Sequence, residues 1–196
     1  VTESIVARNK STGTSTLDYL NATLNLEVSP SLAASMTDGL TYLNDYPYLC
    51  MEQTVSRFLP NLISLEALKL AGKSSDDLQK GLDAQVQPAL QRIISNQNED
   101  GGWGLWPGSG NSQPTTTAYV ILGLVEAQKA GYTFPSNTEE QGLTYLEGQL
   151  SYTFLSNSNW QNNQAAFMLY ALAEGGRPNG NGVSALYSSR KKLDIY

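Results

Sequence analysis

The sequence predicts a mainly α-helical fold, made of helical hairpins in an inner and an outer layer and preceded by one β-strand. Three observations support this: helical spacing of apolar residues after Pro30, alternation of amphipathic with all-apolar segments, and a weak internal repeat. Helices with one apolar stripe lie on the outside of a fold, and helices that are apolar all round are buried. Repeated helix pairs build either a solenoid or a closed α/α toroid.

The N-terminal segment differs from the rest of the chain. Residues 1–16 are polar, and 11–16 have the Ser, Thr and Gly composition of a linker. Between Leu20 and Val28 apolar and polar residues alternate, which indicates one half-buried strand. Because one strand cannot form a sheet alone, we interpret residues 1–29 as the end of a preceding β-domain and its linker.

Helical patterns occupy most of residues 30–196. The segments 76–94 and 137–150 carry one apolar stripe each and are predicted to be outer helices, whereas 117–130 and 164–173 are predicted to be inner ones. Two further helices are predicted at 32–43 and 52–70, and Pro60 is expected to kink the second of them.

The repeat relates the two predicted inner helices. Its offset is 48 residues, the length of one helical hairpin, and the matched pairs are Ala118 with Ala166, Tyr119 with Phe167, Leu124 with Leu172, and Glu126 with Glu174.

Composition excludes several classes of protein. With 12 basic and 18 acidic residues and a net charge of -6, the chain has no basic patch for nucleic acid. One cysteine cannot form an internal disulfide. The lack of histidine removes imidazole bases, Cys-His and Ser-His pairs, and the usual zinc ligands. We therefore expect no metal, no cofactor and no catalytic residues of a hydrolase.

Cys50 is the main functional candidate. Pro47 biases Tyr46 away from helical geometry, and a helical pattern follows Cys50, so this residue is expected near a helix N-cap. Gln53 is then the N3 residue, whose side chain bends back toward the cap in a capping box. A helix N-terminus also stabilises a thiolate leaving group. These features suit an internal Cys-Gln thioester, although by spacing alone a buried, inert cysteine is the commoner explanation.

A second motif, Gln97-Asn-Glu-Asp-Gly-Gly-Trp-Gly-Leu-Trp106, combines turn glycines with two tryptophans. We interpret Trp103 and Trp106 as apolar anchors that staple this loop to the core, with ligand binding as the alternative.

The stretch Tyr46-Pro-Tyr-Leu-Cys-Met-Glu-Gln-Thr-Val-Ser-Arg-Phe-Leu-Pro60 resembles the thioester signature of bacterial alpha-2-macroglobulins. The resemblance implies a thioester between Cys50 and Gln53. Its flanking residues are Tyr46, Pro47, Tyr48, Leu49, Met51 and Glu52. The family usually has Gly before the cysteine and Gly or Leu after it, where this chain has Leu49 and Met51. Glu52 is interpreted as a first-turn carboxylate favoured by the helix dipole rather than as an acid catalyst.

The resemblance also implies the architecture and the activity. The family uses the α/α toroid, so residues 30–196 are expected to be the N-terminal part of a thioester domain, an incomplete toroid that invites dimerisation. The implied function is a protease inhibitor rather than an enzyme, in which lysine amines of target proteases attack the thioester. Other domains of the parent macroglobulin are implied partners, and the periplasm or cell envelope is the implied location. Without histidine, amines are expected to react directly and in preference to hydroxyls.

Two alternatives remain. One is a non-covalent helical interaction module with a silent thioester motif. The other is an α/α-toroid enzyme of terpene-cyclase type, because such enzymes share the Asp-Gly-Gly-Trp-Gly turn. That enzyme would need an Asp-rich motif, and Asp76-Asp77 is a single pair at a helix start.

Overall fold

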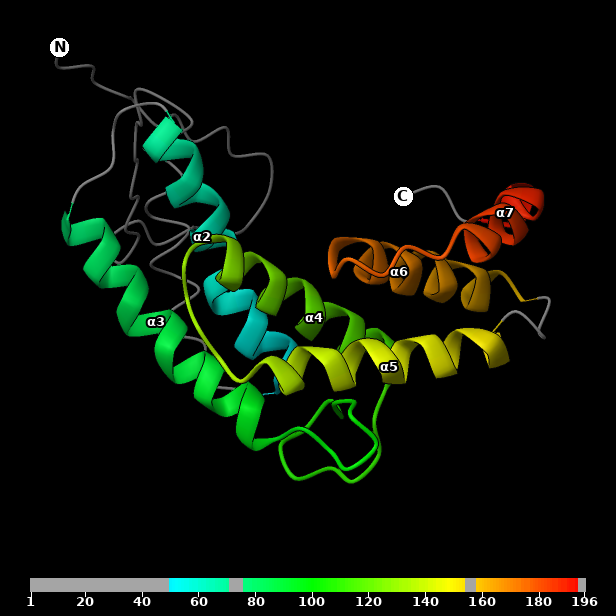
Figure 1. Cartoon of the computed structure of the whole chain (residues 1–196), viewed down its shortest axis with the longest axis horizontal. Coiled ribbons are helices and arrows are strands. Elements are labelled where there is room, and N and C mark those ends of the chain that lie inside the picture. The colour runs from blue at the N-terminus through cyan, green and yellow to red at the C-terminus, as the bar shows by residue number, and fades with distance from the viewer. Residues whose placement is uncertain (1–49, 71–75, 154–157, 194–196) are drawn as a thin grey trace, which may run out of the picture.

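A computed structural model describes residues 50–70, 76–153 and 158–193, and these residues form helices and connecting loops with no β-strand among them (Figure 1). The elements are α2 (Met51–Leu70), α3 (Asp76–Ser95), α4 (Pro114–Lys129), α5 (Ser136–Thr153), α6 (Asn159–Glu174), α7 (Gly180–Ser188) and the 3-10 turn η2 (Arg190–Lys192). The mainly α-helical prediction is confirmed. The strand predicted at 20–28, the helix predicted at 32–43 and the boundary at residue 29 lie outside the described residues.

The helices pack as two layers of hairpins. The inner layer is α2, α4 and α6, in which α4 lies between its two neighbours and packs on both. The outer helices α3, α5 and α7 each pack against an inner helix that precedes or follows them in sequence (Figure 1). This is the inner and outer order that the hydrophobic pattern predicts, and it is the arrangement of an α/α toroid.

Helix α4 forms the centre of the core because apolar residues occupy most of its circumference. Buried residues of α4 include Val120, Ile121 and Leu124. At Gly123 an added Cβ would lie 2.9 Å from the Cγ1 atom of Val55 and 3.1 Å from the Cζ atom of Phe58. The missing side chain therefore lets α2 approach α4 closely.

Two helices begin earlier than predicted. Helix α4 begins at Pro114, where proline is favoured in a first turn because it has no N–H to leave unpaired. Helix α6 begins at Asn159, and the Ser158 hydroxyl oxygen accepts a hydrogen bond from the Gln161 N–H. The first turn of α4 is Pro-Thr-Thr-Thr, and that of α6 has Trp160 as its one apolar residue, so hydrophobic periodicity does not detect either turn.

Two other predictions about apolar residues are wrong in part. Helix α6 is not buried on all sides, because Tyr170 is 55% exposed. Trp106, expected to anchor its loop, is 56% exposed. Trp160, Val183 and Tyr187 are also exposed on α6 and α7, and the expected dimer stays a prediction.

Trp103 holds the loop between α3 and α4 to three helices. Its ring is fully buried, and its Nε1–H donates to the Ile93 carbonyl of α3 at 2.8 Å. Its backbone N–H donates to the Thr117 hydroxyl of α4 at 2.9 Å. A Cβ at Gly142 of α5 would lie 2.7 Å from the Trp103 ring, so glycine makes room for the indole.

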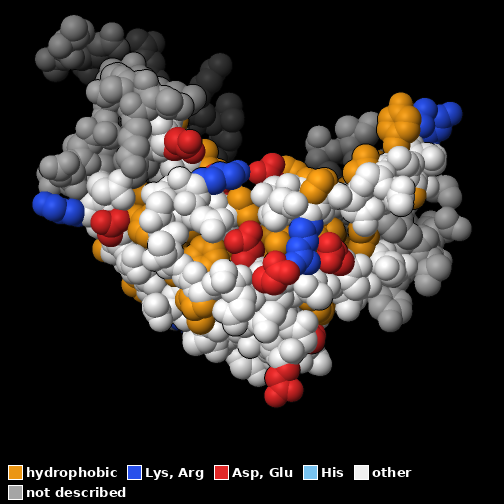
Figure 2. Space-filling view, in the orientation of Figure 1, with side chains coloured by type: hydrophobic (Ala, Val, Ile, Leu, Met, Phe, Trp, Pro, Cys, Tyr) orange, Lys and Arg blue, Asp and Glu red, His pale blue; other side chains and the backbone are white. Residues whose placement is uncertain are grey.

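Ion pairs join the hairpins at the surface. The Lys129 ammonium lies 2.7 Å from Glu126 and 2.9 Å from Glu174, the two glutamates that the repeat makes equivalent. Hydrogen bonding to Glu126, and then to Glu174, raises the pKa of Lys129 above its ordinary value. Arg177 forms ion pairs with Glu140 and Glu147 of α5. Figure 2 shows acidic and basic side chains interspersed on this face of the molecule.

We predict that Trp103→Ala lowers the free energy of unfolding by about 3 to 5 kcal/mol, the usual cost of removing a buried aromatic ring. Trp106→Ala, in the same loop, should change it by less than about 0.5 kcal/mol because the ring is exposed. Urea denaturation measures both variants. Equal losses in the two variants would contradict the assignment of Trp103 as the anchor.

Candidate functional site

Cys50 is the N-cap residue of α2. It directly precedes the first helical residue, Met51, and the residue is buried, with 7% of its surface exposed. The backbone N–H of Gln53 donates to the Cys50 Sγ atom at 3.4 Å. Sulfur therefore takes the position that a serine or aspartate oxygen takes in ordinary N-caps.

The first turn of α2 is fixed from two directions. The Met51 N–H donates to the Leu105 carbonyl at 2.8 Å, which ties the turn to the loop anchored by Trp103. The Thr54 N–H and the Thr54 hydroxyl each donate to the Cys50 carbonyl at 2.9 Å. The backbone that carries Cys50 and Gln53 is thus held by both a neighbouring loop and its own helix.

The Gln53 side chain lies at this turn without a polar partner. It is partly buried, and its Oε1 atom is buried with no hydrogen-bond partner among the described residues. A buried carbonyl oxygen without a donor is unfavourable by about 1 to 3 kcal/mol. The reciprocal capping-box bond from this side chain is therefore not made, whereas the bond from the Gln53 backbone to Cys50 is.

The Cys50 thiol is free in this structure. An acyl group and a thiol three residues apart thus share one helix turn, and the positive end of the α2 dipole lies beside the sulfur. Such a turn can hold a thioester ring, because ring closure needs the Cys50 Sγ and the Gln53 Cδ on the same side of the helix end.

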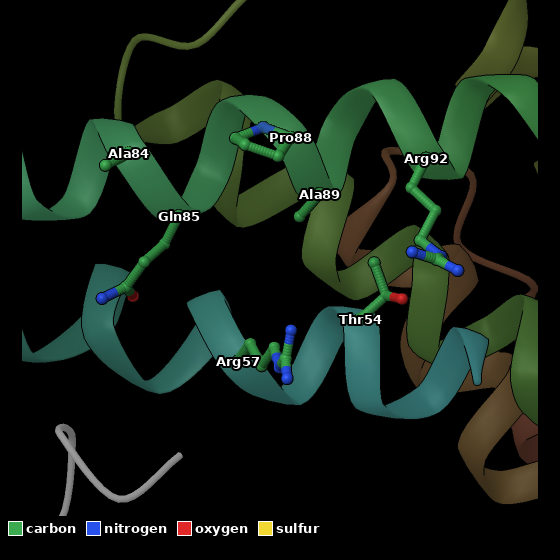
Figure 3. Close-up of a pocket in the computed structure, with 7 residues that line it drawn as sticks. All are labelled: Thr54, Arg57, Ala84, Gln85, Pro88, Ala89 and Arg92. Carbon is green, nitrogen blue, oxygen red and sulfur yellow. The ribbon is translucent and has the colours of Figure 1, made fainter. Parts of the chain in front are cut away.

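Two cavities flank the first turns of α2. One, of about 310 Å³, is lined by Glu52 with Thr115, Thr116 and Tyr119 of α4 and Phe167 of α6. The other, of about 300 Å³, lies between α2 and α3. Figure 3 shows its lining residues, which are Thr54, Arg57, Ala84, Gln85, Pro88, Ala89 and Arg92.

The predicted site residues fall into three groups. Cys50, Met51, Glu52 and Gln53 lie together at the start of α2, with Met51 buried and Glu52 exposed in the first turn. Trp103 lies in the adjoining loop and does not line either cavity. Tyr46, Pro47, Tyr48 and Leu49 lie outside the described residues.

Sequence reasoning missed three contributors to the site. Thr54 follows Cys50 by four residues, and this spacing often indicates a hydroxyl bonded to the preceding turn, so it was detectable. Leu105 acts through its backbone carbonyl, which no side-chain motif reports. Arg92 comes from α3, and no local spacing relates it to Cys50.

The described residues contain no group of three or more Cys, Asp or Glu side chains arranged as metal ligands. Within the same ranges no helix is both long and apolar enough to cross a membrane.

Comparison with known proteins gives a consistent result. A family model described as the A-macroglobulin TED domain matches residues 18–171, more than half of the chain. The alpha-2-macroglobulin of Thermotoga maritima is 36% identical over 116 residues, which are 59% of this chain and 7% of that protein.

Solved structures show the same similarity. A native alpha-2-macroglobulin fragment from Escherichia coli, spanning domain MG7 to the C-terminus, has a TM-score of 0.65 and 25% identity. The match covers 81% of this chain and 26% of that one. A Salmonella alpha-2-macroglobulin reacted with methylamine has a TM-score of 0.67 and 26% identity, over 84% of this chain and 11% of that one. The chain thus spans a small part of each relative.

We predict that Cys50→Ser keeps or slightly raises stability, because serine is among the better N-cap residues. Cys50→Ala should be less stable than Cys50→Ser by about 1 kcal/mol, because alanine leaves the Gln53 N–H without its acceptor. Urea denaturation compares the two variants directly. An alanine variant as stable as the serine variant would show that residue 50 does not cap α2.

Proposed function

The chain belongs to the A-macroglobulin TED domain family, and we propose that it is the covalent protease-trapping module of a macroglobulin-type endopeptidase inhibitor. One observation carries the proposal. The Cys50 Sγ atom caps α2 at 3.4 Å from the Gln53 backbone nitrogen, while the Gln53 Oε1 atom is buried with no hydrogen-bond partner in the part of the chain that the structure describes. The Gln53 carboxamide, which would form the bond to sulfur, and the Cys50 Sγ atom are therefore in the same helix turn. The chain also belongs to a family whose members are protease inhibitors.

Thioester formation joins the Cys50 Sγ to the Gln53 Cδ and releases the side-chain nitrogen as ammonia. In capture the sulfur is the leaving group. A lysine amine attacks the Gln53 carbonyl carbon, a C–N bond forms, the C–S bond breaks, and Cys50 leaves as a thiolate. The proton that the amine loses is taken up by the thiolate or by water. The product is an amide crosslink between this chain and the protease.

The surroundings of the turn suit this reaction. The N-terminal end of α2 stabilises the departing thiolate. The hydrogen bonds to Leu105 and Cys50 hold the backbone, so the reacting atoms do not have to be ordered at the moment of attack. Because the chain has no histidine, no acyl-imidazole intermediate can form on it, and amines react directly.

The Salmonella relative was reacted with methylamine, a small primary amine that presents the same nucleophile as a lysine side chain. We extend that reactivity to this chain. We further propose the setting that the resemblance implies: a bait region and other domains elsewhere in a parent macroglobulin, and a periplasmic or cell-envelope location.

We predict that methylamine releases one titratable thiol per chain and blocks later capture, because it takes the place of a lysine at Gln53. The intact mass before treatment should be lower than the sequence mass by one ammonia, and treatment should add one methylamine. Equal thiol titres and equal masses before and after treatment would contradict a closed thioester.

We also predict that Cys50→Ser and Gln53→Glu both fold but lose capture. Serine keeps the cap but would give an oxygen ester, a poorer acyl donor, and glutamate resembles the hydrolysed product while favouring the α2 dipole. Denaturing gel electrophoresis after incubation with trypsin measures crosslink yield, and urea denaturation verifies the fold. A wild-type yield from either variant would show that the reacting sulfur or carbonyl lies elsewhere.

A further inference from the structure

The cavity between α2 and α3 gathers positive charge on an otherwise acidic chain. Arg57 of α2 and Arg92 of α3 both line it, together with the polar side chains of Thr54 and Gln85. In Figure 3, Arg92 extends from α3 toward Thr54, and Arg57 lies on the facing side of α2. None of the described residues that line the cavity is acidic, although the chain has a net charge of -6.

Arg92 contributes a buried, unsatisfied donor to this cavity. Its Nε atom is buried and has no hydrogen-bond partner among the described residues, and its guanidinium forms no ion pair with any of them. A buried donor without an acceptor is unfavourable. An anion in the cavity would supply the acceptor that the Arg92 Nε–H lacks among the described residues.

The chemistry of the lining selects a carboxylate. A guanidinium presents several N–H donors in a planar fork that matches the two oxygens of a carboxylate. The Gln85 Oε1 atom accepts a hydrogen bond from the Asn61 side chain, so this oxygen does not compete for the guanidinium of Arg92. Ala84, Pro88 and Ala89 supply an apolar wall that suits the methylene groups of an acidic side chain.

The cavity lies close to the reacting turn. Thr54, which lines it, is the next residue after Gln53, and its hydroxyl donates to the Cys50 carbonyl. Arg57 follows Gln53 by four residues, so the two side chains share one face of α2 and are separated by one turn, about 5 to 6 Å. A molecule that carries an amine and a carboxylate a few bonds apart can therefore reach both.

We propose that this cavity is a carboxylate subsite, centred on Arg92, that favours capture of lysines with an acidic neighbour. This proposal rests on the proposed thioester reaction. The property that it adds is a carboxylate close to the attacking amine. A target carboxylate held by Arg92 raises the local concentration of the nearby amine at the Gln53 carbonyl.

The kinetic test compares two amines of equal chain length, 6-aminohexanoate and n-hexylamine, by the rate at which each releases the Cys50 thiol. For each variant, the rate with 6-aminohexanoate is divided by the rate with n-hexylamine. The difference in basicity between the two amines then cancels when these ratios are compared between variants. In Arg92→Gln the ratio should fall roughly tenfold, the size of one charge-assisted hydrogen bond. Arg92→Lys keeps the positive charge but loses the planar pair of N–H donors, so its rate ratio should lie between those of the wild-type and Arg92→Gln proteins.

The matched control is Arg190→Gln. Arg190 carries the same charge, lies over the Tyr187 ring 4.3 Å from its centroid, and does not line the cavity. This variant should keep the wild-type ratio. An equal ratio in wild-type and Arg92→Gln protein would overturn the proposal, and so would an equal fall in Arg190→Gln, which would show a general charge effect.

A second measurement does not depend on the thioester. Calorimetric titration with glutarate should show binding to the wild-type chain and to Arg190→Gln, and none to Arg92→Gln. If no amine releases a thiol, the proposed function fails while this titration still decides whether the cavity binds a carboxylate. Glutarate binding without a rate advantage for 6-aminohexanoate would assign the cavity to a carboxylate other than that of the captured target, and would overturn the capture role.

Discussion

The burial of Trp103 is the constraint on which the rest of the structure depends. Its ring and its two N–H groups join the loop after α3 to α3, α4 and α5. That loop in turn supplies the Leu105 carbonyl, which receives the Met51 N–H at the start of α2. The position of the reacting turn is therefore set by an indole far from it in sequence, through one loop and one backbone hydrogen bond.

The site contains both contacts that stabilise the first turn of α2 and buried polar atoms that lack hydrogen-bond partners among the described residues. Capping by sulfur, the threonine bonds to the Cys50 carbonyl and the buried Met51 all stabilise the turn. The Gln53 Oε1 atom and the Arg92 Nε atom are buried and have no hydrogen-bond partner among the described residues. One of these unsatisfied atoms is bonded to the acyl carbon of Gln53, and the other belongs to a residue of α3 that lines the cavity between α2 and α3. The arrangement fits a site whose missing partners come from the molecule that it captures.

Much of the fold could be predicted from the sequence, because helix type follows from hydrophobic spacing. The inner positions of α4 and α6 and the outer positions of α3 and α5 were predictable in this way. The first turns of α4 and α6 were not predictable, since proline chemistry and N-capping set them rather than burial. The exposure of Trp106 was also not predictable, because two tryptophans in one turn have the same composition signal whichever one is buried.

Only those residues of the candidate site that are close together in the sequence could be predicted. Cys50 and Gln53 follow from a local motif, whereas Arg92 is brought to α2 by the packing of α3.

The most direct test of the account is a crystal structure of freshly purified chain at a resolution that separates bonded from contacting atoms. The account predicts continuous electron density at a single C–S bond length between the Cys50 Sγ and the Gln53 Cδ, with no side-chain nitrogen on Gln53. An intact Gln53 carboxamide beside a free Cys50 thiol would contradict it.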